Sequence, residues 1–227
     1  YNKNHFINII KSPIEIKLNT HHFKIAASPI KSSLKFDRDY IISELVSEGK
    51  EIILSDSENN SWFLDDLLFA TKKLASNTYL THLKTQDIAI PTNYLNLIKK
   101  PPNLNSKIEK FSFNAELKFI KNAGNTLTQK IGINASNLNI TFVWGFLNID
   151  INGDFYLSEE GSLNGNGKIN VKNWLKTLSL IEDNKPLKPD FYTKINSVLT
   201  FLASQTPLKT KKLAIPIQVD DNIISIG

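Results

Sequence analysis

The chain has 227 residues, of which 41% are hydrophobic, and this excludes wholesale disorder because the chain can bury a sizeable core. It contains no cysteine, which excludes disulfides, thiol catalysis and cysteine-based zinc sites. The net charge of +5 includes a single arginine, Arg38, among dispersed lysines, so we expect no nucleic-acid partner.

The first 55 residues predict four or five strands. Apolar and polar residues alternate over 14–18, as pleating requires, and short extended stretches follow at 22–26 and 34–36. Residues 40–46 and 51–54 predict two further strands joined by a turn at Glu48-Gly49-Lys50.

Residues 56–74 predict a helix. Phe63, Leu67 and Leu68 recur at helical spacing, and Ser61 is a candidate N-cap. The acidic pair Asp65-Asp66 would then complement the dipole of the first turns. Extended character returns at 80–90, and a single helical turn is expected after Pro91, before Pro101-Pro102 ends it.

The clearest alternation runs through 107–119 and then 137–174, and it predicts a β-meander. Apolar residues fall on one side of each strand and Asn, Thr or Lys on the other. Gly145 interrupts the first strand, Asn152-Gly153 supplies the type I′ turn of a hairpin, and Glu159-Glu160-Gly161 makes the next turn.

Helices and a last hairpin are expected after the meander. Asn173 can cap a helix over 174–182, and Pro189 or Asp190 can start a second helix. The chain then ends in two strands around a turn at 220–222, and Pro216 suggests that the first of them lies at a sheet edge or has a bulge.

These elements predict a β-rich α+β fold: a curved antiparallel sheet of many meander strands with two or three short helices packed on it. We expect a single domain over residues 1–227, or two halves divided into 1–100, with the N-terminal strands and a helix, and 101–227, with the meander and two helices.

No pattern of catalytic residues emerges, so we expect a protein that is not an enzyme and that uses no cofactor and no metal. The neighbouring histidines His21 and His22 point to opposite faces of an extended chain and cannot chelate together. The acidic pairs fall at expected turns or helix starts, where acids have structural roles. No G-x-S-x-G motif occurs.

The dipeptide Trp144-Gly145 has two interpretations. It can be a core tryptophan beside a glycine bulge, or the ring can line a groove for an apolar ligand. On the second interpretation the lining would be Phe142, Trp144, Leu147, Ile149, Phe155 and Leu157.

Several features occur in a specific order between about residue 83 and Gly227. They are the segment IAIPTNYLNLI, a strand ending in VWG, the turns ING and EEGSLNG, helices after VKNW and at INSVLTFLA, and the closing LAIPIQVDDNIISIG. In this order the chain resembles the domain-of-unknown-function family 2125, uncharacterised envelope proteins of Gram-negative bacteria. The closing Asp-Asp-Asn departs from the family's usual Asp-Gly at that turn.

The resemblance implies a periplasmic or exported protein without established catalytic residues. Since the sequence has no Met even at position 1, a segment before Tyr1 could anchor it to the inner membrane. The expected partner is a lipid or other apolar ligand in a β-groove. The alternatives are a scaffolding protein that contacts an envelope protein partner and a hydrolase with an unrecognised acid pair.

Overall fold

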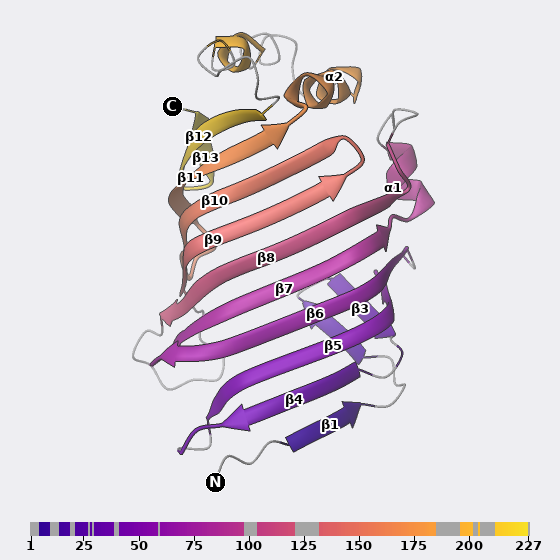
Figure 1. Cartoon of the computed structure of the whole chain (residues 1–227), viewed down its shortest axis with the longest axis vertical. Helices are drawn as coiled ribbons and strands as arrows, with labels where there is room; N and C mark the ends of the chain where they lie inside the picture. The colour runs from indigo at the N-terminus through magenta and orange to yellow at the C-terminus, as the bar shows by residue number, and fades with distance from the viewer. Residues whose placement is uncertain are drawn as a thin grey trace.

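The computed structural model describes residues 5–9, 14–18, 21–26, 28, 30–38, 41–58, 60–97, 104–120, 132–184, 196–201, 204 and 212–226. Over these residues the chain forms one antiparallel sheet of 13 strands (Figure 1). The mostly antiparallel sheet and the short helices confirm the predicted β-rich class.

The strands follow one another along the sheet almost in sequence order, which is the pattern of a meander. Their bounds are β1 His5–Ile9, β2 Ile14–Leu18, β3 His21–Ala26, β4 Ile30–Phe36, β5 Ile42–Ser55, β6 Ser61–Ala75, β7 Thr78–Ala89, β8 Lys107–Ile120, β9 Gly132–Trp144, β10 Leu147–Leu157, β11 Leu163–Lys172, β12 Lys212–Asp220 and β13 Ile223–Ile226. The helices are α1 Thr92–Leu97 and α2 Trp174–Asn184, and residues 196–201 are also helical.

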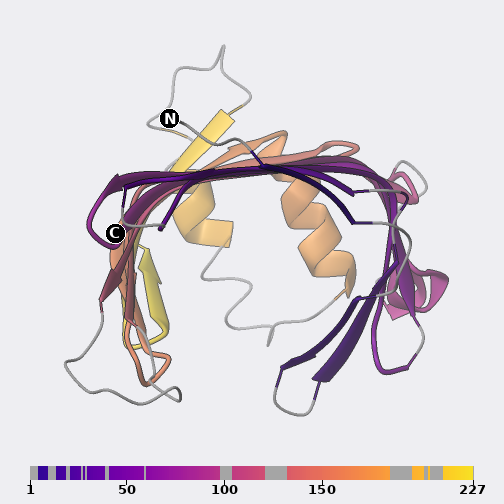
Figure 2. The same ribbon diagram turned by 90° about the horizontal axis from the view of Figure 1, so that it is seen from below.

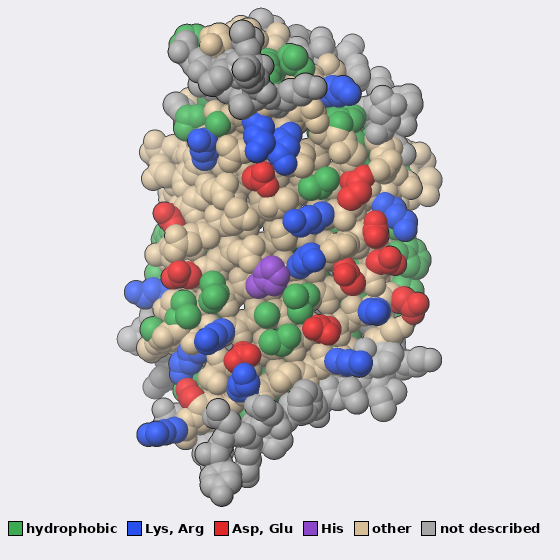
Figure 3. Space-filling model, viewed as in Figure 1, with side chains coloured by type: hydrophobic (Ala, Val, Ile, Leu, Met, Phe, Trp, Pro, Cys, Tyr) green, Lys and Arg blue, Asp and Glu red, His purple; other side chains and the backbone are tan. Residues whose placement is uncertain are grey.

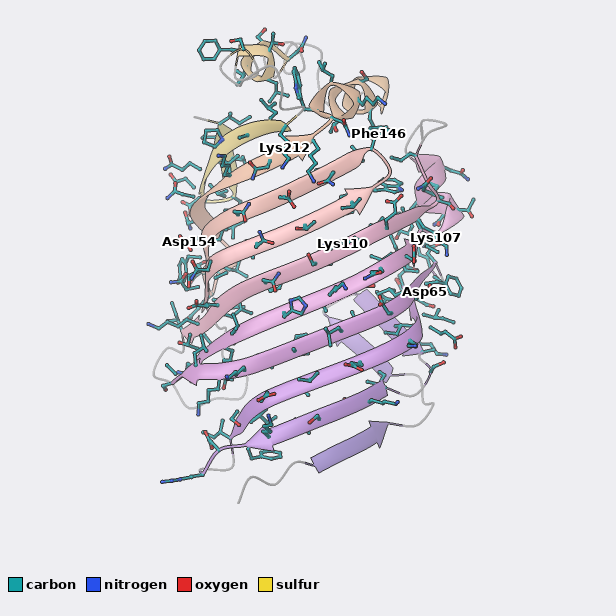
Figure 4. The ribbon with its side chains drawn as sticks, viewed as in Figure 1. Asp65, Lys107, Lys110, Phe146, Asp154 and Lys212 are labelled. Atoms are coloured by element: carbon teal, nitrogen blue, oxygen red, sulfur yellow. The ribbon has the colours of Figure 1, made fainter. Side chains whose placement is uncertain are left out.

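The sheet is bent into a trough with a broad floor and two side walls (Figure 2). Irregular positions in the strands account for the bends, because a bulge or a left-handed residue turns a strand sharply. At one long edge of the floor, Glu51 and Asp87 have positive φ angles of 51° and 50°. At the other edge, Asn137 has a φ of 52°, and its amide donates to Asp154 Oδ1 at 2.8 Å. Figure 4 places Asp154 at this second edge.

The two faces of the sheet differ in chemistry. Lys110 lies on the outer face of the floor (Figure 4), so the period of two puts Ser112 and Asn114 beside it. Phe111 and Phe113 therefore face into the trough. Figure 3 shows the outer face, on which charged and other polar groups predominate over apolar ones.

Polar side chains on the outer face bond across neighbouring strands. His82 pairs with Asn114, Asn139 donates to Asn152, and the Thr141 hydroxyl donates to Asp150 Oδ1 at 2.9 Å. Such cross-strand pairs of polar side chains are typical of a solvent-facing side of a sheet, and they fix the strand register. The inner face is thereby left to the apolar residues.

The helix predicted over 56–74 is wrong, because β6 occupies most of this stretch. The spacing of Phe63, Leu67 and Leu68 imitates a helix, yet Leu67 faces the trough and Leu68 the outer face. The Ser61 hydroxyl, expected to cap that helix, instead bonds to the Ser55 hydroxyl at the base of a hairpin. Pairing with strands on both sides outweighs the local helical pattern.

Two predicted turns are also wrong. Gly49 lies inside the single long strand β5, whose first half pairs with β4 and whose last residues pair with β3. Asn152-Gly153 lies inside β10, paired with both β9 and β11. The turn actually falls at Gly145-Phe146, where Trp144 pairs with Leu147 and Gly145 has a φ of 56°.

The remaining elements follow the prediction closely. The strands at 80–90 and 107–119, the turn of α1, the helix after Asn173 and the final hairpin are confirmed. The start expected for the second helix, at Pro189 or Asp190, falls outside the described residues. Pro216 lies in β12, which pairs with β11 on one side and β13 on the other. The pairing with β13 begins only at Ile217, so Pro216 has no strand on the β13 side that would need its missing amide hydrogen.

Candidate functional site

The inner face of the trough carries a continuous row of apolar side chains. Seven residues on seven adjacent strands lie opposite one another in register: Phe69, Leu83, Phe113, Ile140, Ile151, Ile169 and Ile215. Six steps between strands at about 4.8 Å each give this row a length of about 29 Å.

A second inner row runs beside the first, two residues along each strand. Its members are Leu67, Thr85, Phe111, Phe142, Ile149, Val171 and Leu213. Thr85 alone is polar in this row, and its hydroxyl donates to the Asp66 carbonyl oxygen at 2.7 Å. Since that hydrogen bond satisfies the hydroxyl within the sheet, the row offers an essentially apolar surface.

The two rows are covered at one end of the trough. There Val171, Leu213, Ile215 and Ile217 form a buried cluster with Leu199 from the helical residues 196–201. We call this region the capped end. Leu213 is only 1% exposed.

The first row is less covered between β6 and β9. Phe69, Leu83, Phe113 and Ile140 are all only half-buried there, although they continue the same row as Ile215. We call these four residues the open middle. They are apolar surface on a concave face that the described part of the chain leaves partly exposed.

A second buried cluster lies where β9 turns into β10. It consists of Leu104, Ile108, Trp144 and Leu147. The Trp144 indole nitrogen donates to the Asn105 carbonyl oxygen at 2.7 Å, so its polar edge is satisfied inside the protein. This burial matches the interpretation of Trp144 as a core residue, while the glycine beside it forms a turn rather than a bulge.

The six residues expected to line a groove all lie on strands β9 and β10, on the inner face. Trp144 and Leu147 belong to the turn cluster, and Phe142 packs against it. Ile149 and Phe155 pack against the capped end. Leu157, near the end of β10, is exposed. Their role as ligand contacts stays a prediction.

The open middle extends the candidate site beyond those six residues. The alternation in β8 already pointed to Phe113, whereas the stretch at 80–90 was predicted only as extended, and its sequence does not show which face Leu83 occupies. Phe69 was hidden because the sequence predicted a helix there. Residues from four strands come together only when the meander is in register.

A hollow of about 480 Å³ lies where β5 pairs first with β4 and then with β3. Its lining carries both signs of charge, with Lys31, Lys50 and Lys84 against Glu48 and Asp66. This mixture does not select a ligand of one charge.

One titratable pair stands near α1. The Asn60 amide, which donates to Asp56 Oδ2 at 2.8 Å, is the main cause that holds the pKa of Asp56 below its usual value. The Tyr94 hydroxyl donates to the same oxygen at 3.0 Å, and this bond raises the pKa of Tyr94. The Tyr94 ring also lies 5.4 Å from that of Trp62.

In the described part of the chain, no group of three His, Asp or Glu side chains could hold a metal ion. Asp65-Asp66 lies in a strand, while Glu159-Glu160 and Asp220-Asp221 are at turns. The absence of enzymatic activity stays a prediction. A membrane-crossing helix is likewise not found among the described residues.

A family model described as an uncharacterized protein conserved in bacteria, DUF2125, matches residues 1–227. The match covers the whole chain, including the first 82 residues, on which the sequence resemblance did not depend. No curated protein matches this chain.

Proposed function

We propose that this chain, which belongs to the DUF2125 family of uncharacterized bacterial proteins, holds the apolar chain of a lipid in its trough. The observation that carries the proposal is the open middle. Four large apolar side chains in register stay half-buried on a concave face, where an acyl chain can cover them.

The energetics favour a long chain over a short one. Burying ten methylenes contributes about 8 kcal/mol, and association costs at least about 4 kcal/mol, which leaves only millimolar affinity. Fifteen methylenes contribute about 12 kcal/mol, and the remaining 8 kcal/mol corresponds to micromolar affinity. Outside the capped end, the first inner row runs over four strand-to-strand steps from Phe69 to Ile151, or about 19 Å, along which such a chain can lie.

The proposed setting is the bacterial cell envelope, with the protein periplasmic or exported and attached to the inner membrane through a segment before Tyr1. The order of motifs shared with the family supports this setting.

Fluorescence titration with cis-parinaric acid, a fatty acid that becomes fluorescent in apolar surroundings, tests the proposal. Phe113→Glu places a charge in the open middle and should weaken binding at least about tenfold, because an unpaired charge opposes the apolar chain. Lys110→Glu is the matched control, since Lys110 lies on the outer face of the same strand. It should bind like the unchanged protein.

Native mass spectrometry of the purified protein supplies the second measurement and should show a bound lipid mass. The proposal fails if neither method detects an apolar ligand, or if both variants bind equally well. Far-UV circular dichroism of both variants separates lost binding from lost folding.

Scaffolding through protein contacts is the second candidate function. It is favoured by the burial of Trp144 and Leu147, two of the six expected lining residues, in a cluster of the protein's own side chains. A trough that takes up no lipid, with a stable complex between this chain and an envelope protein, would support this candidate.

A further inference from the structure

We propose that the helices at the capped end dock this protein on an anionic lipid bilayer. The docking surface consists of the apolar residues Leu175, Val198 and Phe201 and the lysines Lys172, Lys176 and Lys212. None of these residues belongs to the open middle, so the inference does not depend on lipid binding there.

The helices at this end have apolar residues on two sides. Trp174 of α2 and Leu199 of residues 196–201 both pack at the buried cluster of the capped end. Their neighbours Leu175 and Val198, and Phe201 beyond them, are exposed instead, with Leu175 and Phe201 each 63% exposed. Large apolar side chains in water on short helices are typical of segments that lie in a membrane interface.

Figure 1 places both helices together beyond β11 and β12, at one end of the molecule. The three apolar side chains are therefore presented at the same end. A flat, extended partner can contact them without entering the trough.

The three lysines of the docking surface indicate that the partner is negatively charged. Lys172 and Lys212 are direct neighbours in the register of β11 and β12, and Lys176 is the third residue of α2. Like charges opposite each other destabilise a sheet, and within the described residues none of the three forms an ion pair. Figure 3 shows blue side chains gathered over this end of the outer face.

Asp150 lies on the outer face of β10, two positions from the register partner of Lys172, but it accepts a hydrogen bond from Thr141 and, in the described part of the chain, forms no ion pair with these lysines. Asp220 and Asp221 lie at the other end of β12 from Lys212, about 26 Å away along an extended strand. Anionic head groups can therefore relieve the lysine repulsion while the acyl region takes up the apolar side chains.

Co-sedimentation with vesicles tests this inference. The protein should bind vesicles of equimolar phosphatidylglycerol and phosphatidylcholine and release them at high salt, but bind pure phosphatidylcholine weakly. The double variant Leu175→Asp/Phe201→Asp should lower the partition coefficient at least about tenfold. Lys172→Glu/Lys212→Glu should lower it by a similar factor.

Two matched controls keep the test specific. Phe63→Asp changes a side chain that is 50% exposed on β6, away from the capped end, and Lys110→Glu changes a lysine of the outer face in the middle of the sheet. Both should bind vesicles like the unchanged protein. Equal losses in the controls, or no vesicle binding by the unchanged protein, would overturn the inference.

Self-association is the remaining outcome. If Phe201→Asp abolishes a concentration-dependent dimer in sedimentation velocity, and vesicles are not bound, the surface joins two copies of the chain and the bilayer inference is wrong. Loss of cis-parinaric acid binding alone would leave the docking result unchanged, which separates this inference from the proposed function.

Discussion

The capped end and the open middle are two parts of one inner face that differ in burial. Ile215 and Phe113 belong to the same in-register row, yet Ile215 is buried under a helix and Phe113 is half-buried. Both stretches are equally apolar in sequence. The difference therefore lies in what covers them, and it divides a single surface into a core and a candidate ligand site.

This division has energetic consequences. Stabilisation from apolar burial is roughly proportional to the area removed from water, so the capped end contributes fully to folding. The open middle contributes less in the free protein and has area left to bury against a ligand. Substitutions in the two regions should separate stability from binding.

The largest expected effect concerns Leu213 at the capped end. Leu213→Ala should lower the free energy of unfolding by about 4 kcal/mol, because it removes a fully buried side chain and leaves a cavity. Leu83→Ala in the open middle should cost only about 1 kcal/mol, because this half-buried side chain loses less buried area. Urea denaturation of both variants measures the difference, and equal losses would break the comparison.

A glycine at the capped end should show the next largest effect. A Cβ added at Gly165 would lie 2.3 Å from the Asp154 carbonyl oxygen and 2.7 Å from Phe155 Cδ1. Gly165→Ala should therefore cost about 3 kcal/mol in unfolding free energy.

Gly161 is the matched control for this substitution. It has a positive φ of 89°, but an added Cβ would meet nothing within 4 Å. Gly161→Ala should cost only about 1 kcal/mol, from backbone strain alone. A larger loss at Gly161 than at Gly165 would contradict tight packing around Phe155.

The smallest effect concerns pH and a site far from the capped end. The pKa of Asp56 is lowered on folding. The Asp56 carboxylate therefore stabilises the folded state above the unfolded pKa near 3.8, and this stabilisation is lost as pH falls through the folded pKa. The pKa of Tyr94 is raised on folding. The Tyr94 hydroxyl therefore stabilises the folded state below the unfolded pKa of 10.0, and this stabilisation is lost as pH rises through the folded pKa.

Tyr94→Phe should remove the alkaline part of this dependence. Urea midpoints measured across the alkaline range should fall for the unchanged protein and fall less for the variant. Leu83→Ala, in the open middle, should retain the alkaline fall of the unchanged protein. The same slope in Tyr94→Phe and the unchanged protein would show that the bond to Asp56 does not stabilise the fold.

Sequence reasoning succeeded where alternation was long and uninterrupted. β8 and β9 were predicted because apolar and polar residues alternate in each over at least six residues, and neighbouring residues alone determine which side chains share a face of a strand. It failed at β6 and at Gly49 in β5, where the bend in the sheet interrupts the pattern. Glu51 and Asp65 lie beside that bend, and Figure 4 places Asp65 at the edge of the floor.

Only part of the candidate site could be predicted for the same reason. Phe142, Ile149 and Phe155 were found from the meander, because their strands are adjacent in sequence. The contribution of Phe69 depended on recognising β6 as a strand and on its pairing with β7. Residues that are distant in sequence enter the site only through sheet register.

The amino-acid sequence by itself determined the family, the strand-rich class and, for most strands, which side chains share a face. The tertiary structure decided which face is concave and which part of it the helices cover. The physical reason is that alternation is set by neighbouring residues, whereas curvature and capping arise from pairings and contacts between residues far apart in the chain.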